Sequence, residues 1–367
     1  MNILYLSNKR RWGGVLSWME KTSQGLRQKQ HKVWIFSNPK SSFTLGLKHL
    51  DYIIPFSFGF NYNPITILKT IAFIKKNNID LVVSNIKKEV IVGAIACKIC
   101  KIPHVRRIGS EQDYNNKTVQ RFYEKGYIHG TISPCDFLND YFSKRFSFIK
   151  AAEMYRVYNG RNPKEFNQGE ISSYKKKYRV DSSKIIIGTL SQLSEVKNVE
   201  GLVNVFNRLT KTFNNIELVI AGDGPLKAKL LNMIHEMKLT EKVKYIGFVS
   251  ESQAVSSMYD IGVLFSNQEG FSNTIVEFMS VATIPICTNV GGQKEIIEDE
   301  INGYLIEPKN EEALYTKLAN LISHTDLRNK ISEKAIETIK HKFSENKMID
   351  DVERIYERII ERYQTKS

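Results

Sequence analysis

Residues 269–295 constrain the fold of this chain more than any other stretch. They follow the apolar run 261–265, which is typical of a buried strand. A turn containing Gly270 comes next, and Ser272 or Asn273 can cap the helix that the following residues predict. A strand, a glycine turn and a capped helix in this order are typical of a parallel α/β sheet, which binds its ligands at the carboxyl ends of its strands.

Two carboxylates flank this turn. Glu269 lies in the turn itself, and Glu277 lies about one turn into the predicted helix. The backbone N–H groups and the dipole of a helix start attract an anion such as phosphate. A carboxylate outside that anion pocket can accept hydrogen bonds from neutral hydroxyls, so the two features together suit a sugar nucleotide. The alternative is that Glu269 is a loop charge and Glu277 lies on a solvated helix face.

With the second glycine turn at Gly291–Gly292, this segment resembles the Glu-x7-Glu signature of the retaining glycosyltransferases of family 4. The resemblance implies the GT-B fold, an α/β architecture of two doubly wound Rossmann-like domains facing a cleft, with a C-terminal helix that crosses back to the first domain. It is strong over residues 185–306 and weaker over residues 1–165. It implies an acceptor-binding domain over 1–165, a nucleotide-sugar-binding domain over 166–345 and a terminal helix over 346–367.

The same resemblance implies the donor site. After the predicted strand that begins at Ile185, the chain carries Gln192 where relatives carry arginine, and Lys197 five positions later. Lys197 is expected to stabilise the charge on the leaving phosphate, and it carries more of that task because Gln192 brings no charge. Catalytic roles are expected for Lys197 and for Glu269, which would orient the hydroxyls of the donor sugar, while Glu277 would orient the ribose. The other donor contacts that the resemblance implies are Gly14, Gln192, Val249, Gly270, Phe271, Ser272, Asn273 and Thr274.

Candidates for the acceptor are weaker. Arg106 and Arg107 lie in a predicted strand that leads to Gly109, where many relatives carry histidine, and Glu111 follows. These three residues are predicted to serve the acceptor, although a basic strand end is often only a solvated rim.

The polar run 161–178 is interpreted as the linker between the domains.

The chain is long enough for two domains, and its net charge of +14 is unevenly distributed. Residues 1–165 contain 27 Lys/Arg and 11 Asp/Glu, a net +16, whereas residues 166–367 contain 26 and 28, a net −2. A basic half beside a neutral half indicates that one domain meets an anionic surface. Basic and aromatic residues also adjoin at Arg121–Phe122 and Arg145–Phe146. We therefore expect the first domain to bind an anionic membrane surface and reach a lipid-linked acceptor there.

The sequence contains no apolar run near the roughly 18 residues of a membrane span, and its start differs from a signal peptide. Four cysteines are too few for a disulfide scaffold. The expected location is therefore the cytoplasm, including peripheral attachment to the inner face of the cell membrane.

The predicted function is transfer of a sugar from a UDP- or GDP-linked donor to a hydroxyl of a glycan or lipid-linked acceptor, with retention of configuration. It would serve the synthesis of surface polysaccharide or lipopolysaccharide. The chain has no Asp-x-Asp pair, so the reaction is predicted to need neither a metal ion nor a cofactor beyond the nucleotide-sugar co-substrate. The sequence leaves the oligomeric state open.

Two alternatives remain. An inverting transferase or an epimerase of the same fold would need a base, for which His129 and Glu111 are the candidates. A non-enzymatic module would bind polysaccharide or nucleic acid through its basic half. Binding to nucleic acid is disfavoured because the positive charge is not interleaved with a recognisable DNA- or RNA-binding motif.

Overall fold

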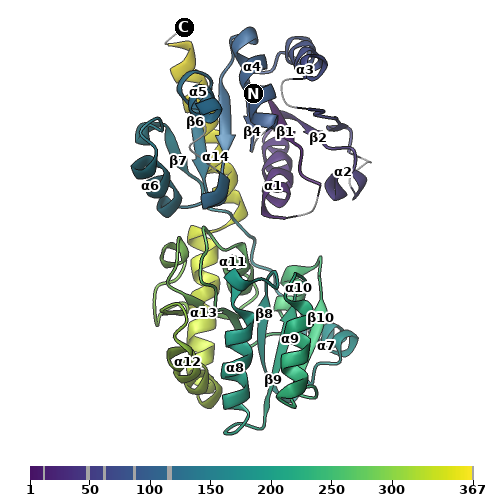
Figure 1. Ribbon diagram of the computed structural model, residues 1–367, viewed down its shortest axis with the longest axis vertical. Helices are drawn as coiled ribbons and strands as arrows, with labels where there is room; N and C mark the ends of the chain where they lie inside the picture. The colour runs from purple at the N-terminus through teal and green to yellow at the C-terminus, as the bar shows by residue number, and fades with distance from the viewer. Residues whose placement is uncertain (11–12, 47–49, 61–62, 86–87, 114–117, 366–367) are drawn as a thin grey trace. The chain divides into compact units, whose positions relative to one another are not determined.

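The computed structural model describes residues 1–10, 13–46, 50–60, 63–85, 88–113 and 118–365 (Figure 1). The chain forms two compact units. Unit 1 consists of Met1–Asn159 and Glu345–Ser367, and unit 2 consists of Gly160–Ser344. Each unit is a parallel sheet with covering helices, so both have the doubly wound, Rossmann-like architecture predicted from the sequence.

The sheet of unit 1 has the strand order β3-β2-β1-β4-β5-β6-β7, which reverses between β1 and β4. Its strands are β1 (Asn2–Ser7), β2 (Lys32–Ser37), β3 (Ile53–Pro55), β4 (Leu81–Ser84), β5 (His104–Arg107), β6 (Gly130–Ser133) and β7 (Met154–Arg156). Its helices are α1 (Gly14–Gln28), α2 (Ser42–Gly46), α3 (Pro64–Lys76), α4 (Lys88–Cys100), α5 (Thr118–Tyr127), α6 (Asp136–Arg145) and α14 (Glu345–Gln364).

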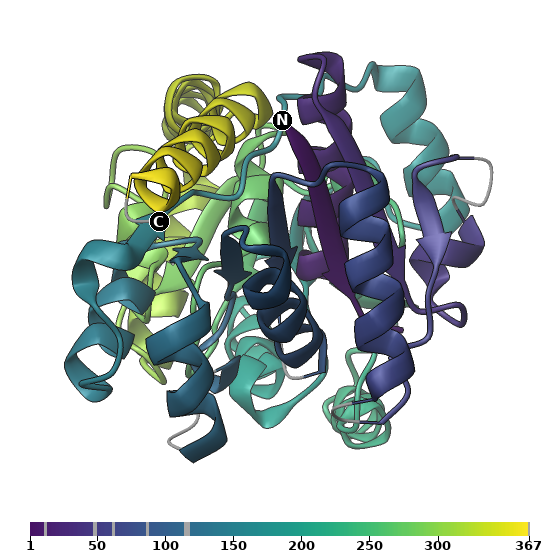
Figure 2. The same ribbon diagram turned by 90° about the horizontal axis from the view of Figure 1, so that it is seen from above.

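Alternating residues of β1 supply two cores, one on each face of this sheet. Ile3 and Tyr5 pack with α1 and α14 on one face, whereas Leu4 and Leu6 pack with residues of α3 and α4 on the other. A strand that is buried on both faces has a continuous apolar run in its sequence, and residues 3–6 of β1 form such a run. Figure 2 shows helices on both sides of these strands.

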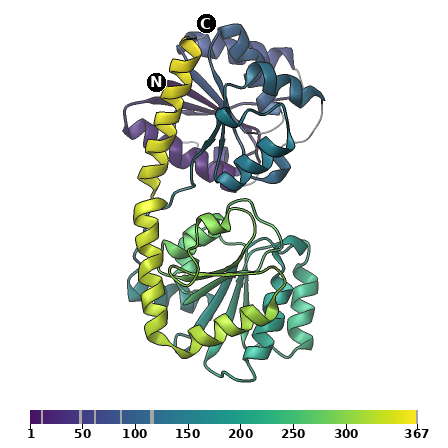
Figure 3. The same cartoon turned by 90° about the vertical axis from the view of Figure 1, so that its left-hand side faces the viewer.

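The terminal helix α14 belongs to unit 1, as predicted (Figure 3). Its apolar face, which includes Val352 and Tyr356, is buried against α1 and the sheet. Tyr356 Oη donates a hydrogen bond to Tyr5 Oη over 3.3 Å. At the start of α14, Glu345 forms an ion pair with Lys21. The helix is therefore part of the core of unit 1.

The sheet of unit 2 has the strand order β10-β9-β8-β11-β12-β13. Its strands are β8 (Ile185–Leu190), β9 (Ile216–Ala221), β10 (Val243–Gly247), β11 (Ile261–Leu264), β12 (Ile284–Thr288) and β13 (Tyr304–Ile306). Its α-helices are α7 (Gln168–Tyr178), α8 (Val199–Leu209), α9 (Lys227–Glu236), α10 (Ser252–Ser256), α11 (Asn273–Met279), α12 (Glu311–Ser323) and α13 (Thr325–Lys342). Short 3-10 turns follow β8 at η3 (Glu195–Lys197) and β12 at η4 (Gln293–Glu295).

The interpretation of residues 161–178 as a linker was wrong for its second part, which forms helix α7 of unit 2. A capping box starts this helix. Asn167 Oδ1 accepts a hydrogen bond from Glu170 N, and Glu170 Oε2 accepts one from Asn167 N, both over 2.9 Å. The Asn-x-x-Glu spacing was the sequence signal for this helix. Within the residues described, no helix is long and apolar enough to cross a membrane.

Candidate functional site

The strand order of unit 2 reverses between β8 and β11, which pair in parallel through Ile187 with Ile261 and Gly188 with Gly262. In open α/β sheets, ligands bind beyond the carboxyl ends of the strands at such a reversal. Lys197 lies in η3 after β8, and Glu269 lies in the loop after β11. The two residues that the sequence singled out for catalysis therefore lie in the segments that follow the two strands flanking the reversal.

Lys197 and Glu269 form an ion pair between Nζ and Oε1. Ser266 Oγ donates to the same carboxylate oxygen over 3.0 Å. The side chain of Lys197 is 24% exposed and that of Glu269 is 10% exposed. Glu269 is therefore not the solvated loop charge of the alternative interpretation, and Lys197 is also largely shielded from solvent. The pair places an ammonium, which can bind phosphate, next to a carboxylate, which can accept hydroxyl hydrogen bonds.

Helix α11 begins beside this pair. Ser272 is its N-cap, and its Oγ accepts a hydrogen bond from Ile275 N over 3.4 Å. Thr274 Oγ1 donates to Leu190 O, the last residue of β8, over 3.3 Å. The start of α11 is thus fixed to the strand that leads to Lys197. The predicted donor residues from Glu269 to Thr274 form the loop after β11 and the first residues of α11, at the reversal.

The second glycine turn packs directly against this loop. Gly291 has a φ of +61°, and a Cβ atom there would lie 1.9 Å from Glu269 O. Gly292 N donates to Gly270 O over 2.6 Å. Only glycine fits at position 291, because a side chain would be strained and would also displace the backbone of Glu269.

The loops after β8 and β9 are joined in the same way. Ser191 N donates to Ala221 O and Leu193 N to Asp223 O, each over 3.0 Å. Gln192, between them, is exposed. Val249 follows β10, the edge strand on the far side of β9, and so lies farther along the sheet edge than the other donor candidates of unit 2.

Glu277 lies one turn into α11, as expected, but it has a partner that sequence reasoning missed. Arg161 donates to Glu277 Oε1 from Nε over 3.1 Å and from Nη2 over 2.8 Å. Both residues are buried, so Glu277 does not lie on a solvated helix face. Among the described residues, Oε2 of Glu277 accepts no hydrogen bond, so one oxygen remains for a ligand. The two residues are 116 positions apart, and no sequence pattern connects them.

Sequence reasoning also missed Gln293, which follows the second glycine turn. Its side chain is buried, and neither amide atom has a hydrogen-bond partner within the described part of the chain. Ser191 Oγ and Asn267 Oδ1 are also buried, and neither atom has a hydrogen-bond partner among the residues that the structure describes. All three residues follow carboxyl ends of strands of unit 2, namely β8, β11 and β12. Because native proteins rarely leave buried polar atoms unpaired, these atoms are candidates to bind a ligand or water.

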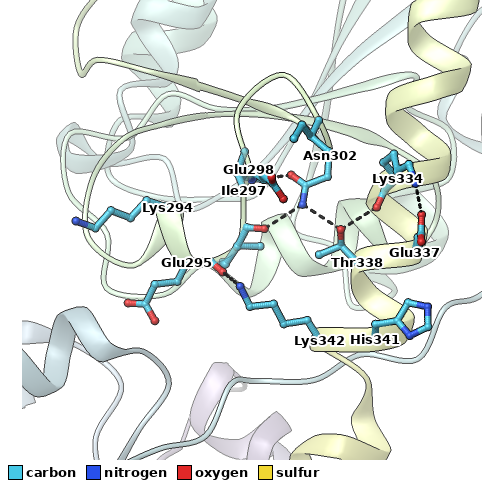
Figure 4. A pocket seen from close by; sticks show the side chains of 12 residues that line it. Lys294, Glu295, Ile297, Glu298, Asn302, Lys334, Glu337, Thr338, His341 and Lys342 are labelled. Atoms are coloured by element: carbon cyan, nitrogen blue, oxygen red, sulfur yellow. Dashed lines mark hydrogen bonds and ion pairs between the residues drawn. The ribbon is translucent and has the colours of Figure 1, made fainter.

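A hollow of about 660 Å³ lies between the loop after η4 and helix α13 (Figure 4). Asn302 occupies its wall, where its Oδ1 accepts from Glu298 N over 2.9 Å and its Nδ2 donates to Thr338 Oγ1 over 3.0 Å. Lys342 Nζ donates to Glu295 O over 2.8 Å. These bonds fasten the segment that follows the second glycine turn to α13, and so they support the loop of Glu269 indirectly.

The acceptor candidates in unit 1 lie in a different environment from the one expected. Arg106 is buried, forms an ion pair with Glu124 and donates from Nη2 to Asp113 O over 2.6 Å. Arg107 is also buried, and burial lowers its pKa to about 10. The idea of a solvated basic rim was therefore wrong for both arginines, and their contacts favour a structural role.

The contacts of Arg107 also indicate a structural role. Arg107 donates to Asn159 Oδ1 over 3.2 Å, and its guanidinium lies 5.0 Å from the ring centre of Trp18. Glu111 begins the 3-10 turn η1 (Glu111–Asp113) and is partly exposed. Glu111 is therefore the acceptor candidate whose side chain can contact a ligand while the core of unit 1 stays intact.

Three further predictions concern Gly14, His129 and the binding of a metal ion. Gly14 is the first residue of α1 in unit 1. His129 precedes β6, at the amino edge of the sheet, and burial lowers its pKa. Throughout the described ranges, no group of three or more His, Cys, Asp or Glu side chains is arranged to hold a metal ion.

Comparison with known families places the match in unit 2. Residues 170–338 match the family described as Glycosyl transferases group 1. N-acetyl-alpha-D-glucosaminyl L-malate synthase of Bacillus anthracis is 26% identical over 200 residues, which is 54% of this chain and 52% of that protein.

A second relative, from Campylobacter jejuni, is N-acetylgalactosamine-N,N'-diacetylbacillosaminyl-diphospho-undecaprenol 4-alpha-N-acetylgalactosaminyltransferase. It is 32% identical over 148 residues, 40% of each chain. The chain thus matches about half or less of the length of these curated relatives.

Solved structures match over nearly the whole chain. A glycosyltransferase from Rickettsia africae superposes with a TM-score of 0.87 at 24% identity, covering 98% of both chains. Anabaena HepE in complex with UDP superposes with a TM-score of 0.85 at 19% identity, covering 98% of this chain and 100% of the other. These likenesses establish that the protein has the GT-B fold.

Proposed function

We propose that this protein is a glycosyltransferase that moves a sugar from a nucleotide-sugar donor to a hydroxyl of an acceptor. The observation that carries the proposal is the Lys197–Glu269 pair at the strand reversal of unit 2. It lies inside the segment that matches Glycosyl transferases group 1. An ammonium beside a carboxylate, next to a capped helix start, provides separate partners for the phosphate and the sugar of one donor.

In this proposal Lys197 binds the phosphate and stabilises the charge that develops on it as the sugar leaves. Glu269 accepts hydrogen bonds from hydroxyls of the donor sugar, and Oε2 of Glu277 accepts them from the ribose. Since Arg161 holds the other oxygen of Glu277, the orientation of that carboxylate is fixed before the donor binds. The donor's phosphate competes with Glu269 for Lys197, so binding loosens the ion pair and frees the carboxylate for the sugar.

We further propose a UDP-linked donor and retention of configuration, with the leaving phosphate guiding the acceptor hydroxyl on the same face and with no metal ion. The structure of HepE was solved with UDP, which supports the choice of base. A lipid-linked acceptor at the cytoplasmic face of a membrane is supported by the undecaprenol-diphosphate-linked substrate in the name of the Campylobacter relative. It is also supported by the basic charge of unit 1.

The test is a screen of UDP-, GDP- and ADP-sugars by thermal shift, since a donor that binds the folded state stabilises it by mass action. At a donor concentration of 100 times Kd, the expected stabilisation is about 2.7 kcal/mol. Turnover is then followed as release of the nucleoside diphosphate with and without EDTA, and NMR of the product gives the anomeric configuration. If no nucleotide sugar raises the Tm and none is consumed, the proposal is wrong.

An inverting transferase or an epimerase is less well supported. His129, one of its two candidate bases, lies at the amino edge of the sheet of unit 1, and its ring packs against Tyr363 at a centre distance of 4.7 Å. Ligands of such sheets bind at the opposite edge. A product with inverted configuration in the NMR experiment would favour this alternative, and salt-resistant retention on DNA without donor binding would favour a nucleic-acid-binding module.

A further inference from the structure

Unit 1 exposes large apolar side chains close together. Phe60, Ile65 and Leu68 are 67%, 64% and 64% exposed. Single exposed apolar residues are common on protein surfaces, but a cluster of them marks an interaction site. Across the described residues, ten large apolar side chains are exposed, and three of them lie between residues 60 and 68.

The cluster is carried by a well-anchored helix. Asn63 caps α3, and its Oδ1 accepts hydrogen bonds from Ile65 N over 3.0 Å and from Thr66 N over 3.4 Å. Thr66, Thr70 and Ile74 bury the opposite side of the helix. Because Ile65 and Leu68 are one helical turn apart, they lie on the same solvent-facing side. Their exposure therefore follows from how the helix is packed.

The segment before α3 is also held in place. Lys88 Nζ donates to Gly59 O over 2.6 Å, and Thr66 Oγ1 donates to Ser57 O over 3.5 Å. These bonds fix the backbone that leads to Phe60 next to the start of the helix. The apolar cluster thus extends from Phe60 onto the first turns of α3.

Lysines accompany the apolar side chains, and acidic residues are missing from the helix. Lys69, Lys75 and Lys76 are exposed on α3, whose sequence contains no Asp or Glu. By composition, unit 1 contains 30 Lys/Arg and 16 Asp/Glu, a net +14, whereas unit 2 contains 23 of each, a net charge of zero. The whole excess of positive charge of the protein therefore belongs to the unit that carries the apolar cluster.

We propose that unit 1 docks on an anionic lipid bilayer through this surface, the α3 face, defined as Phe60, Ile65, Leu68, Lys69, Lys75 and Lys76. Apolar side chains beside lysines are what an interfacial helix needs, because the former enter the acyl boundary while the latter bind anionic headgroups. A protein partner with an apolar patch would bury Phe60, Ile65 and Leu68, but it would leave the positive charge of the neighbouring lysines without an explanation.

The position of α3 fits a lipid-linked acceptor, and in this respect the inference rests on the proposed function. Helix α3 connects β3 to the parallel strand β4, so its first turn lies at the carboxyl edge of the sheet of unit 1. Ligands of such sheets bind at this edge. A bilayer held at the α3 face would lie beside the site that takes the acceptor.

The basic and aromatic runs that the sequence singled out do not provide such a surface. Phe146 is buried in unit 1, and Arg145 lies over the ring of Tyr141 at 5.6 Å. Phe122 is exposed, but its ring contacts Tyr127 at a centre distance of 5.3 Å. The α3 face combines three exposed large apolar side chains with three exposed lysines, whereas in the described part of α5 the exposed large apolar side chain is Phe122 alone.

The test is co-sedimentation of the full chain with vesicles of phosphatidylcholine alone or with 30% phosphatidylglycerol. Binding is expected only with phosphatidylglycerol and should weaken as salt is raised. Replacing the three lysines (Lys69→Gln, Lys75→Gln and Lys76→Gln) should weaken binding about 100-fold, at about 1 kcal/mol for each lysine. The double variant Ile65→Ser and Leu68→Ser should weaken it at least ten-fold without changing the far-UV circular dichroism.

Matched controls come from unit 2. The variant Ile301→Ser removes an exposed apolar side chain there, and Lys330→Gln removes an exposed lysine. Both should bind vesicles like the parent protein. Equal binding to both kinds of vesicle, binding to neither, or unchanged binding of the α3 variants would overturn the proposal. If the α3 variants instead lose self-association in size-exclusion chromatography, the face is an interface between copies of this chain, which also overturns it.

Failure of this inference can be told apart from failure of the proposed function. The α3 variants are expected to retain the donor-induced rise in Tm, because α3 belongs to unit 1 and the donor residues of the ion pair belong to unit 2. Loss of vesicle binding with an intact donor response supports the docking surface. A donor response without vesicle binding in the parent protein rejects the docking surface alone.

Discussion

Lys197 and Glu269, which are 72 positions apart, are joined by an ion pair across the point where the strand order of unit 2 reverses. Ser266 holds the same carboxylate oxygen through its hydroxyl. The two residues that sequence reasoning assigned to different parts of a donor thus neutralise each other in this structure. Under the proposed function, the phosphate and the carboxylate are alternative partners of one ammonium, so we expect the contributions of Lys197 and Glu269 to catalysis to be coupled.

The exchange Glu269→Gln is expected to reduce kcat/KM at least ten-fold, which corresponds to about 1.4 kcal/mol of lost transition-state stabilisation. The double variant Glu269→Gln with Lys197→Ala should lose less activity than the product of the two single effects, since the pair acts as a unit. Steady-state release of the nucleoside diphosphate measures both. Glu333→Gln, an exposed glutamate on α13, is the control and should stay fully active. Full activity of Glu269→Gln would remove this residue from the donor site.

Lys197→Ala is expected to abolish nearly all transfer, whereas Gln192→Ala should have a much milder effect. The reason is that Lys197 brings a charge to the phosphate and Gln192, which is exposed in the same loop, brings only hydrogen bonds. The kcat values of the two variants, measured at saturating donor, decide the order. The reverse order would show that the loop after β8 binds the phosphate through Gln192.

Removal of the Arg161 guanidinium is expected to destabilise unit 2. Arg161→Met leaves Glu277 buried without its partner, at a cost of about 3 kcal/mol. The double variant Arg161→Met with Glu277→Met should regain most of that stability but remain inactive. Thermal unfolding followed by circular dichroism measures the change. Arg208→Met breaks an exposed Arg–Glu pair of the same unit and should shift the Tm little. An equally small shift for Arg161→Met would mean that Glu277 does not need this partner.

Gln293→Met should not reduce the stability of the free protein, because the amide it removes has no partner within the described residues. The same exchange is expected to diminish the rise in Tm caused by the nucleotide sugar, if the buried amide contacts the donor. Gln253→Met serves as the control, since Gln253 Nε2 donates to Ser280 Oγ over 2.8 Å and its loss should lower the Tm. Destabilisation of the free protein by Gln293→Met would assign the amide to bound water instead.

Acid should destabilise unit 1 through His104. Burial lowers the pKa of His104 from 6.5 to about 3, so between these values the unfolded chain binds a proton that the folded chain does not. The contribution of neutral His104 to the free energy of unfolding is therefore fully present above pH 6.5. Below pH 6.5 this contribution falls by about 1.4 kcal/mol for each pH unit, until the pH approaches 3. All three tryptophans, at positions 12, 18 and 34, belong to unit 1, so urea unfolding followed by their fluorescence reports on this unit.

The variant His104→Gln should show a shallower decrease of stability with falling pH, whereas His341→Gln, an exposed histidine of unit 2, should behave like the parent protein. An identical pH dependence of His104→Gln and the parent would exclude His104 as the group responsible.

The sequence alone predicted most of the fold, because its signals are local. Strands buried on both faces give continuous apolar runs such as residues 261–265, and caps such as Ser272 mark where helices begin. The alternation of strands and helices implies parallel sheets, and ligand sites then follow at their carboxyl edges. The capping box of α7 was an equally local signal. Because it was overlooked, the residues of α7 were wrongly interpreted as part of a linker.

Tertiary structure alone decided which side chains meet. No local pattern pairs Arg161 with Glu277, which come from segments 116 residues apart, or removes Arg106 and Arg107 from solvent. Burial depends on which helix covers a strand, and the partner of a charge depends on the loops that converge at the sheet edge. Thus the residue types of the candidate site could be found in the sequence, but their pairing, and with it the charge that a ligand meets, arises only from the packing of distant segments.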